Sequence, residues 1–255
     1  MTPAMHTRAR QRKGSGGFTL VELSVVLVIS SILLSALLGF YTVWNRTAQR
    51  NATQTTLEDL QQAVMGFVLL QGRLPCPDTN GDGLEDAPCL SLQNTTAGVA
   101  WGQVPYGSLG VNGRDGWQNL IDYAVPVTLT QTASGLLNAI QAQSNLRVVC
   151  STTGTAAPMC VSSAGEAVTL AANASAVFIS HGANGRGAGN APPAPVSTDE
   201  LANMPNLKSS PSSQTLFVSR FPTGIDSPLG EFDDQVGWVS AQQLASLLVR
   251  SGLWP

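Results

Sequence analysis

An uncharged, mostly apolar run near the N-terminus constrains this chain more than any other sequence feature. Residues 23–43 are 21 consecutive positions without a charged side chain. As a helix that rises 1.5 Å per residue, this run would span about 30 Å, the thickness of a bilayer's hydrocarbon core. Residues 1–17 contain four basic side chains and no acidic one. The positive-inside rule therefore predicts a cytoplasmic N-terminus and an exported C-terminal part.

A cleaved signal peptide and a plain signal anchor are the two simplest interpretations of such a run. The run is too long for a signal peptide, and no small-residue cleavage site follows it. A plain anchor would gain nothing from Glu22, a carboxylate at the start of the apolar run. An ionisable group is costly inside a membrane, so we interpret Glu22 as functional.

The residues around Glu22 resemble the processing site of type IV prepilins and pseudopilins. The string GFTLVEL begins at Gly17, follows the basic residues and leads into the apolar run. The resemblance implies cleavage between Gly17 and Phe18 on the cytoplasmic face, followed by N-methylation of Phe18. It also implies that Glu22, the fifth mature residue, pairs with the amine of a neighbouring subunit's Phe18, which removes the cost of a lone charge in lipid. The leader has 17 residues, or 13 if translation begins at Met5.

This resemblance implies a structural subunit rather than an enzyme: a minor pilin or pseudopilin of a type IV pilus or a type II secretion pseudopilus. Its partners would be the prepilin peptidase and methyltransferase, other pilins or pseudopilins, and the bacterial inner membrane, with the C-terminal head in the periplasm. The alternative is a signal-anchored periplasmic binding module or hydrolase that joins no filament. Four phrases of the head are also similar to a prepilin-type family: 72–83, 115–125, 177–187 and 233–240.

The helix is expected to continue beyond the membrane. Leu57, Leu60, Val64 and Phe67 recur at helical spacing, and Gly72 with Pro75 would end the helix. We therefore divide the chain into a leader (1–17), a transmembrane half of the helix (18–44), an amphipathic half (45–70) and a β-rich head (71–255).

The head is expected to form an antiparallel sheet packed on the amphipathic half of that helix, which makes the fold α+β and pilin-like. Short apolar runs between turn residues predict strands at 120–125, 146–150, 176–180, 215–221 and 234–239. Periodicity predicts a helix over 128–145, and a Ser240–Gln243 capping box predicts a C-terminal helix. Residues 182–214, rich in Gly, Pro and Ser, are expected to form a mobile loop.

Four cysteines, all in the exported part, predict two disulfides in an oxidising compartment. Three pairings are possible. The local one, Cys76–Cys89 with Cys150–Cys160, is favoured because each pair brackets a turn-rich segment. Neither pair has the C-x-x-C spacing typical of zinc sites.

An acidic loop inside the first bracket is a candidate calcium site. Asp78, Asn80 and Asp82 alternate before a glycine, as in the first half of an EF-hand, with the Leu84 carbonyl and Asp86 as further ligands. Position twelve of that loop, where an EF-hand has glutamate, is a cysteine, and no apolar helix follows. The alternative is a solvated turn, and no other cofactor is expected.

Charge and motifs exclude several other functions. Without the leader, 9 basic residues face 16 acidic ones, a balance of −7 that argues against nucleic-acid binding. Ser180 and His181 could be joined with Asp226 or Asp233 into a catalytic set, but no G-x-S-x-G elbow is present. We interpret His181 as a loop or strand-end residue. The Asp233–Asp234 pair, with Glu231 nearby, could hold a cation or cap a strand, but we interpret it as a solvated turn.

Overall fold

The computed structural model describes residues 17, 19–89, 95–96, 98–131, 146–152, 160, 168–188, 197–204 and 215–252. The chain divides into two compact units, Met1–Arg46 and Thr47–Pro255, the second of which we call the C-terminal unit. The helices are α1 (Leu20–Gln71), α2 (Tyr106–Leu109), the 3-10 turn η2 (Val127–Thr130), α4 (Thr198–Ala202) and α5 (Ala241–Arg250). The strands are β1 (Thr95–Thr96), β2 (Val99–Gln103), β3 (Asp122–Pro126), β4 (Leu146–Val149), β5 (Thr169–Ala171), β6 (Ala174–Ser180), β7 (Thr215–Val218) and β8 (Gln235–Ser240).

Helix α1 confirms the predicted long N-terminal helix. Thr19 and Glu22 form reciprocal contacts at its start: the Glu22 amide donates to Thr19 Oγ1 (3.2 Å), and the Thr19 amide donates to the Glu22 carboxylate (3.5 Å). At its end, Gly72 adopts a left-handed conformation, and its amide donates to the Val68 carbonyl (2.8 Å). Such a glycine is a common way to close a helix.

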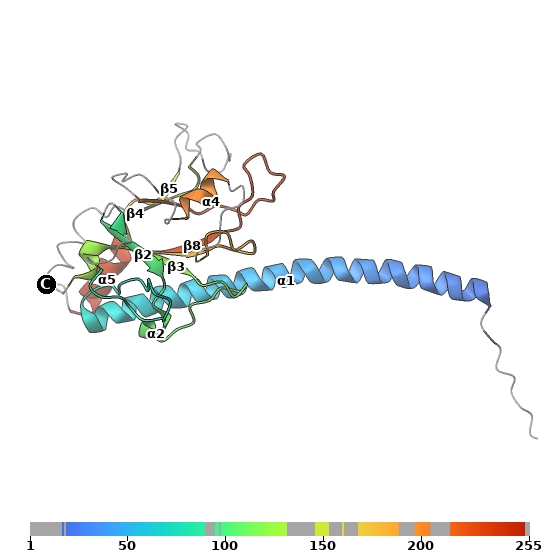
Figure 1. Ribbon diagram of the computed structural model, residues 1–255, viewed down its shortest axis with the longest axis horizontal. Helices are drawn as coiled ribbons and strands as arrows, with labels where there is room; N and C mark the ends of the chain where they lie inside the picture. The colour runs from blue at the N-terminus through green and yellow to red at the C-terminus, as the bar shows by residue number, and fades with distance from the viewer. Residues whose placement is uncertain are drawn as a thin grey trace, which may run out of the picture. The chain divides into compact units, whose positions relative to one another are not determined.

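The larger sheet of the C-terminal unit is antiparallel throughout, with strand order β1-β2-β3-β6-β8. Alternate residues of β6 face opposite sides, as a strand requires. Ala176 and Phe178 join a core cluster with α1 and α5, whereas Val177 and Ile179 join a cluster with the smaller sheet. Phe178 stacks on Tyr123 of β3, with ring centroids 5.4 Å apart. The larger sheet is therefore the middle layer of the C-terminal unit (Figure 1).

The smaller sheet has the order β5-β4-β7 and is not purely antiparallel. Strands β4 and β5 are antiparallel, but β4 and β7 pair in parallel register from Leu146–Thr215 to Val149–Val218. A parallel pair needs a long crossover connection, which the residues between β4 and β7 provide. No local sequence signal indicates that these two strands pair. This sheet, and the parallel pair in it, are additions to the predicted fold.

Most of the predicted head elements are present. Strands β3, β4, β6, β7 and β8 lie where apolar runs predicted them, and Ser240 and Gln243 form the expected capping box of α5. The predicted helix over 128–145 begins where η2 forms a 3-10 turn, and residues 132–145 lie outside the described residues. Within 182–214, the described parts form the turns of residues 182–187 and helix α4.

Both disulfides have the predicted local pairing. Cys76 bonds to Cys89, and Cys150 bonds to Cys160. Cys76 and Cys89 are buried in the same core cluster as Leu57, Leu60 and Val64 of α1. The first disulfide therefore fixes both ends of the acidic loop to the core.

Candidate functional site

The first candidate site is the start of α1, in the N-terminal unit. Large apolar side chains between Leu20 and Trp44 are 51–85% exposed. Among the described residues, α1 is the one helix whose length and apolar composition would allow it to cross a membrane. Gly17 and Glu22 flank its beginning, and Phe18 lies outside the described residues.

The hydroxyl groups of this segment bond back onto their own helix. Ser24, Ser31, Ser35 and Thr42 each donate to the carbonyl oxygen three residues earlier, at 2.7–2.9 Å. In hydrocarbon, polar groups must find partners inside the protein. These four hydroxyls therefore add little to the cost of placing the helix in lipid.

The second candidate site is a group of polar side chains buried where strand ends of the larger sheet meet. Strand β6 runs antiparallel to both β3 and β8, so the end of β6 lies beside the beginnings of its two neighbours. His181 follows β6, Asp122 begins β3, and Asp234 immediately precedes β8. We call these three side chains, together with Glu200 of α4 and Asp233, the His–acid cluster.

His181 is the centre of this cluster and has no exposed surface. Its Nε2 lies 3.0 Å from Asp122 Oδ2, and its Nδ1 lies 3.9 Å from Asp234 Oδ1. Only the first distance is short enough for a hydrogen bond. His181 does follow a strand end, as predicted, but the prediction missed its burial and its acidic neighbours.

Burial and charge shift the pKa values of the cluster. Burial opposes the charge on His181, but the hydrogen bond that its Nε2 donates to Asp122 and the charges of Asp122, Asp234 and Asp115 outweigh it and raise the His181 pKa to about 9. Burial is also the main reason why the pKa of Asp234 rises to about 7. Burial likewise raises the pKa values of Glu200 and Asp233. The cluster therefore contains more carboxylates than it has cations to balance.

The solvated-turn interpretation is wrong for Asp234, which is 5% exposed. Asp234 Oδ2 accepts a hydrogen bond from the Asn203 amide group (2.8 Å), and Asn203 also exchanges hydrogen bonds with the backbone of Val218 in β7. The turn prediction failed because α4 and β7, distant in sequence, cover this segment. An acidic pair directly before an alternating apolar strand was the signal available in the sequence.

Glycines allow the backbone after His181 to approach these acids closely. Gly182 has a φ of 58°, and a Cβ there would lie 2.5 Å from the Asp233 carbonyl oxygen. Gly187 has a φ of 102°, and a Cβ there would lie 2.8 Å from His181 Cε1. Both positions require glycine for conformation and for space. The Gly-rich stretch 182–187 thus encloses the His–acid cluster.

The Ser–His–Asp set considered from the sequence is not assembled here. Ser180 Oγ donates to Asp115 Oδ2 at 2.7 Å, and the His181 ring is held by Asp122. A nucleophilic serine would need its hydroxyl within hydrogen-bond reach of the histidine. This geometry argues against the hydrolase alternative at this position.

The loop 78–86 is closed by its own hydrogen bonds. Asp78 is fully buried, and its carboxylate accepts from the amides of Asn80 (3.1 Å), Gly81 (2.7 Å) and Gly83 (2.7 Å). Asn80 and Asp82 each accept from the amide two residues later, at 2.9 and 2.8 Å.

The other two predicted ligand positions of this loop differ in their surroundings. Asp86 accepts from the Thr79 amide (2.8 Å) and from the Asn80 side chain (3.1 Å), whereas the Leu84 side chain is exposed. Among the described residues, the one acidic trio whose oxygens lie within 4.8 Å of one another is outside this loop. Calcium at 78–86 therefore stays a prediction.

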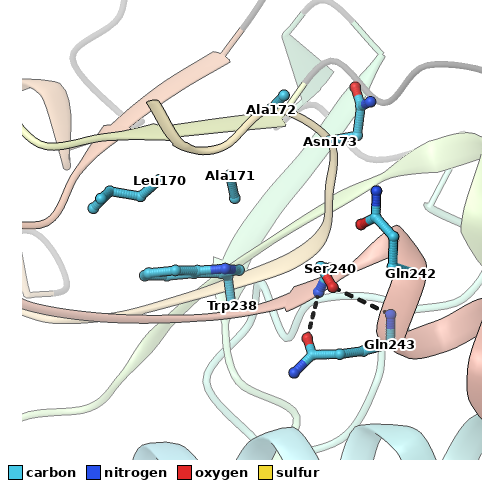
Figure 2. A pocket seen from close by; sticks show the side chains of 8 residues that line it. All are labelled: Leu170, Ala171, Ala172, Asn173, Trp238, Ser240, Gln242 and Gln243. Carbon is cyan, nitrogen blue, oxygen red and sulfur yellow. Dashed lines mark hydrogen bonds between the residues drawn. The ribbon is translucent and has the colours of Figure 1, made fainter. Parts of the chain in front are cut away.

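An open pocket of ≈460 Å³ lies where the β5–β6 turn faces the start of α5. Figure 2 shows Trp238 at its floor beneath Leu170 and Ala171, with the capping box of α5 at its edge. None of the eight residues that line it is charged. It offers a polar and aromatic surface without acid–base groups.

Comparison with known proteins bears on the first candidate site. Residues 12–38 match the family model of the prokaryotic N-terminal methylation motif. The match includes two of the four basic residues, Arg12 and Lys13. It also includes Gly17, Phe18, Glu22 and most of the apolar run. No curated protein and no solved structure matches the chain significantly.

Proposed function

We propose that this chain, which carries a prepilin-type N-terminus, is a minor pilin or pseudopilin of a type IV pilus or a type II secretion pseudopilus. The observation that carries the proposal is the methylation-motif match at residues 12–38, which includes the first part of α1. Prepilin peptidase would cleave between Gly17 and Phe18, and a methyltransferase would modify Phe18. The C-terminal unit would then lie in the periplasm.

The exposed apolar half of α1 supports this proposal. Burying each large aliphatic side chain is worth about 1.5–3 kcal/mol, and this segment leaves many of them exposed. Lipid would cover them before assembly, and the same segments of neighbouring subunits would cover them in a filament.

Glu22 would have two roles in succession. Its contacts with Thr19 cap the helix in the single chain. In a filament, its carboxylate would pair with the amine of a neighbour's Phe18 and set the axial register between subunits. Glutamine preserves the capping geometry, because Gln serves at this position of a capping box, but it removes the charge.

This difference separates the two roles experimentally. We expect Glu22→Gln and Glu22→Leu to be inserted in the membrane and yet absent from sheared or purified filaments, since both lack the charge. Glu22→Asp is the matched control, because it keeps the charge and should retain part of the incorporation. Normal incorporation of Glu22→Gln would contradict the pairing role.

The alternative, a signal-anchored module that joins no filament, differs in processing. A Gly17→Val substitution places a branched side chain at the scissile bond, which should leave the leader attached if prepilin peptidase is the processing enzyme. A plain anchor would give the same molecular mass, apart from the substitution, for wild type and Gly17→Val.

A further inference from the structure

Three carboxylates of the His–acid cluster converge from two separate parts of the chain. Glu200 lies in α4, and Asp233 and Asp234 precede β8. One oxygen from each lies within 4.8 Å of an oxygen from each of the others. Like charges at such distances repel strongly in a buried environment.

Each of these carboxylates has one oxygen held by a neighbour. Asn184 donates its backbone amide to Asp233 Oδ2 (2.9 Å) and its side-chain amide to Glu200 Oε1 (3.0 Å). Asn203 donates to Asp234 Oδ2 (2.8 Å). The three side chains are therefore fixed in place by neutral donors, which orient them without neutralising them.

The other oxygen of each carboxylate has no hydrogen-bond partner. These atoms are Glu200 Oε2, Asp233 Oδ1 and Asp234 Oδ1, and all three are buried. The side chains of Glu200 and Asp234 have no exposed surface at all. Buried polar atoms are normally paired, so three orphaned oxygens in one place indicate a missing partner.

Two cationic side chains nearby, Arg186 and His181, do not fill that place. Arg186 Nη1 bonds to Glu231 at 2.6 Å and lies 4.0 Å from Glu200 Oε2. His181 uses Nε2 for Asp122, and its Nδ1 also lacks a hydrogen-bond partner, 3.9 Å from Asp234 Oδ1. A histidine that ligates a metal commonly donates its other ring N–H to a carboxylate, as His181 Nε2 is placed to do toward Asp122.

We propose that Glu200, Asp233 and Asp234 bind a hard divalent cation, of the class of Ca²⁺ and Mn²⁺, with His181 beside it. Carboxylate oxygens are the ligands that such ions prefer. The cation would compensate the buried negative charge and link α4 to the beginning of β8. Because Asn203 also joins α4 to β7, the ion would hold the two sheets of the C-terminal unit together. This site is independent of the N-terminal processing and assembly proposed above.

Manganese binding to the full-length protein in detergent tests the proposal directly. Free Mn²⁺ gives a six-line electron paramagnetic resonance signal that is lost on binding, so a titration measures both stoichiometry and Kd. We expect saturable binding, competition by Ca²⁺, and a rise in Tm on addition of either ion, because a ligand that binds the folded state stabilises it.

Isosteric variants locate the ion. Glu200→Gln and Asp234→Asn should weaken Mn²⁺ binding more than about tenfold, since even changes around a metal's ligands cost that much. Both variants remove repulsion, so their Tm without metal should equal or exceed that of wild type. Misfolding therefore would not explain their loss of binding. Asp226→Asn, an exposed acid outside the cluster, is the control and should bind as wild type does.

Two results would overturn the site. One is wild-type protein that leaves the six-line signal unchanged at millimolar Mn²⁺. The other is binding that survives Glu200→Gln and Asp234→Asn but is lost in Asp82→Asn, which would assign the ion to the loop 78–86 instead.

Discussion

At the scale of single residues, a buried carboxylate can hold a turn of the backbone in place by accepting hydrogen bonds from its amides. Asp78 is the clearest case, because it is fully buried and accepts three backbone hydrogen bonds. The neighbouring Asp82 is exposed and accepts one, from the Leu84 amide. Asp78 and Asp82, four positions apart, thus contribute very differently to the structure of the loop.

We expect Asp78→Ala to lower the free energy of unfolding by about 3 kcal/mol, because it leaves several amide groups without an acceptor. Asp82→Ala should cost less than about 1 kcal/mol. Urea denaturation in the presence of a chelator measures both without any contribution from bound metal. Equal losses in the two variants would contradict the role assigned to Asp78.

The ion pair between Arg73 and Glu85 gives a prediction for pH. Burial opposes ionisation of Glu85, but hydrogen bonds from Arg73 (2.7 Å to each oxygen) and from the Cys76 amide outweigh it and lower the Glu85 pKa. A carboxyl with a lowered folded-state pKa stabilises the fold above its unfolded-state pKa of about 4.5 and loses that effect as the pH falls through the folded-state value.

The Glu85→Gln variant should therefore be less stable than wild type by about 1–2 kcal/mol at pH 7, a typical value for charge-assisted hydrogen bonds. The difference should shrink as the pH is lowered below 4.5. Chemical denaturation of both proteins from pH 7 to pH 3 measures it, and a difference that grows toward low pH would be inconsistent with this ion pair.

At the scale of secondary-structure elements, the sequence predicted those strands and helices whose signals lie within a few neighbouring residues. The apolar runs of β3, β6 and β8 and the capping box of α5 could be found because strand alternation and helix capping are short-range signals. The Thr19–Glu22 box at the start of α1 has the same kind of short-range signal, a threonine three residues before a glutamate, although it was not predicted. The parallel β4–β7 pair depends on long-range packing and has no local signature.

The loop between Cys76 and Cys89 is the element where calcium is still predicted. If the ion binds Asp78, Asn80, Asp82, the Leu84 carbonyl and Asp86, a Ca²⁺ concentration of about 100 times the Kd would stabilise the fold by about 2.7 kcal/mol. The part of the gain that this loop contributes should be absent in Asp82→Ala but retained in Glu200→Gln. Thermal unfolding of the three proteins with and without Ca²⁺ would decide between this loop and the His–acid cluster.

At the scale of the whole molecule, the two units call for different explanations. The residues of α1 up to Trp44 are mostly exposed and apolar. The methylation-motif match and the favourable transfer of apolar side chains into lipid account for this pattern. The described part of the C-terminal unit is held by three core clusters, two disulfides and a buried polar cluster. Its His–acid cluster could not be predicted from the sequence, because His181, Glu200 and Asp234 meet only after three strands and a helix are in place.

The central claim is that the chain is processed as a prepilin, and the mass of its mature N-terminus tests it most directly. Intact-protein and peptide mass spectrometry of the protein purified from membranes should find a chain that begins at Phe18 with one added N-methyl group. A mature protein that still carries residues 1–17, or that is cleaved after Trp44, would contradict the claim.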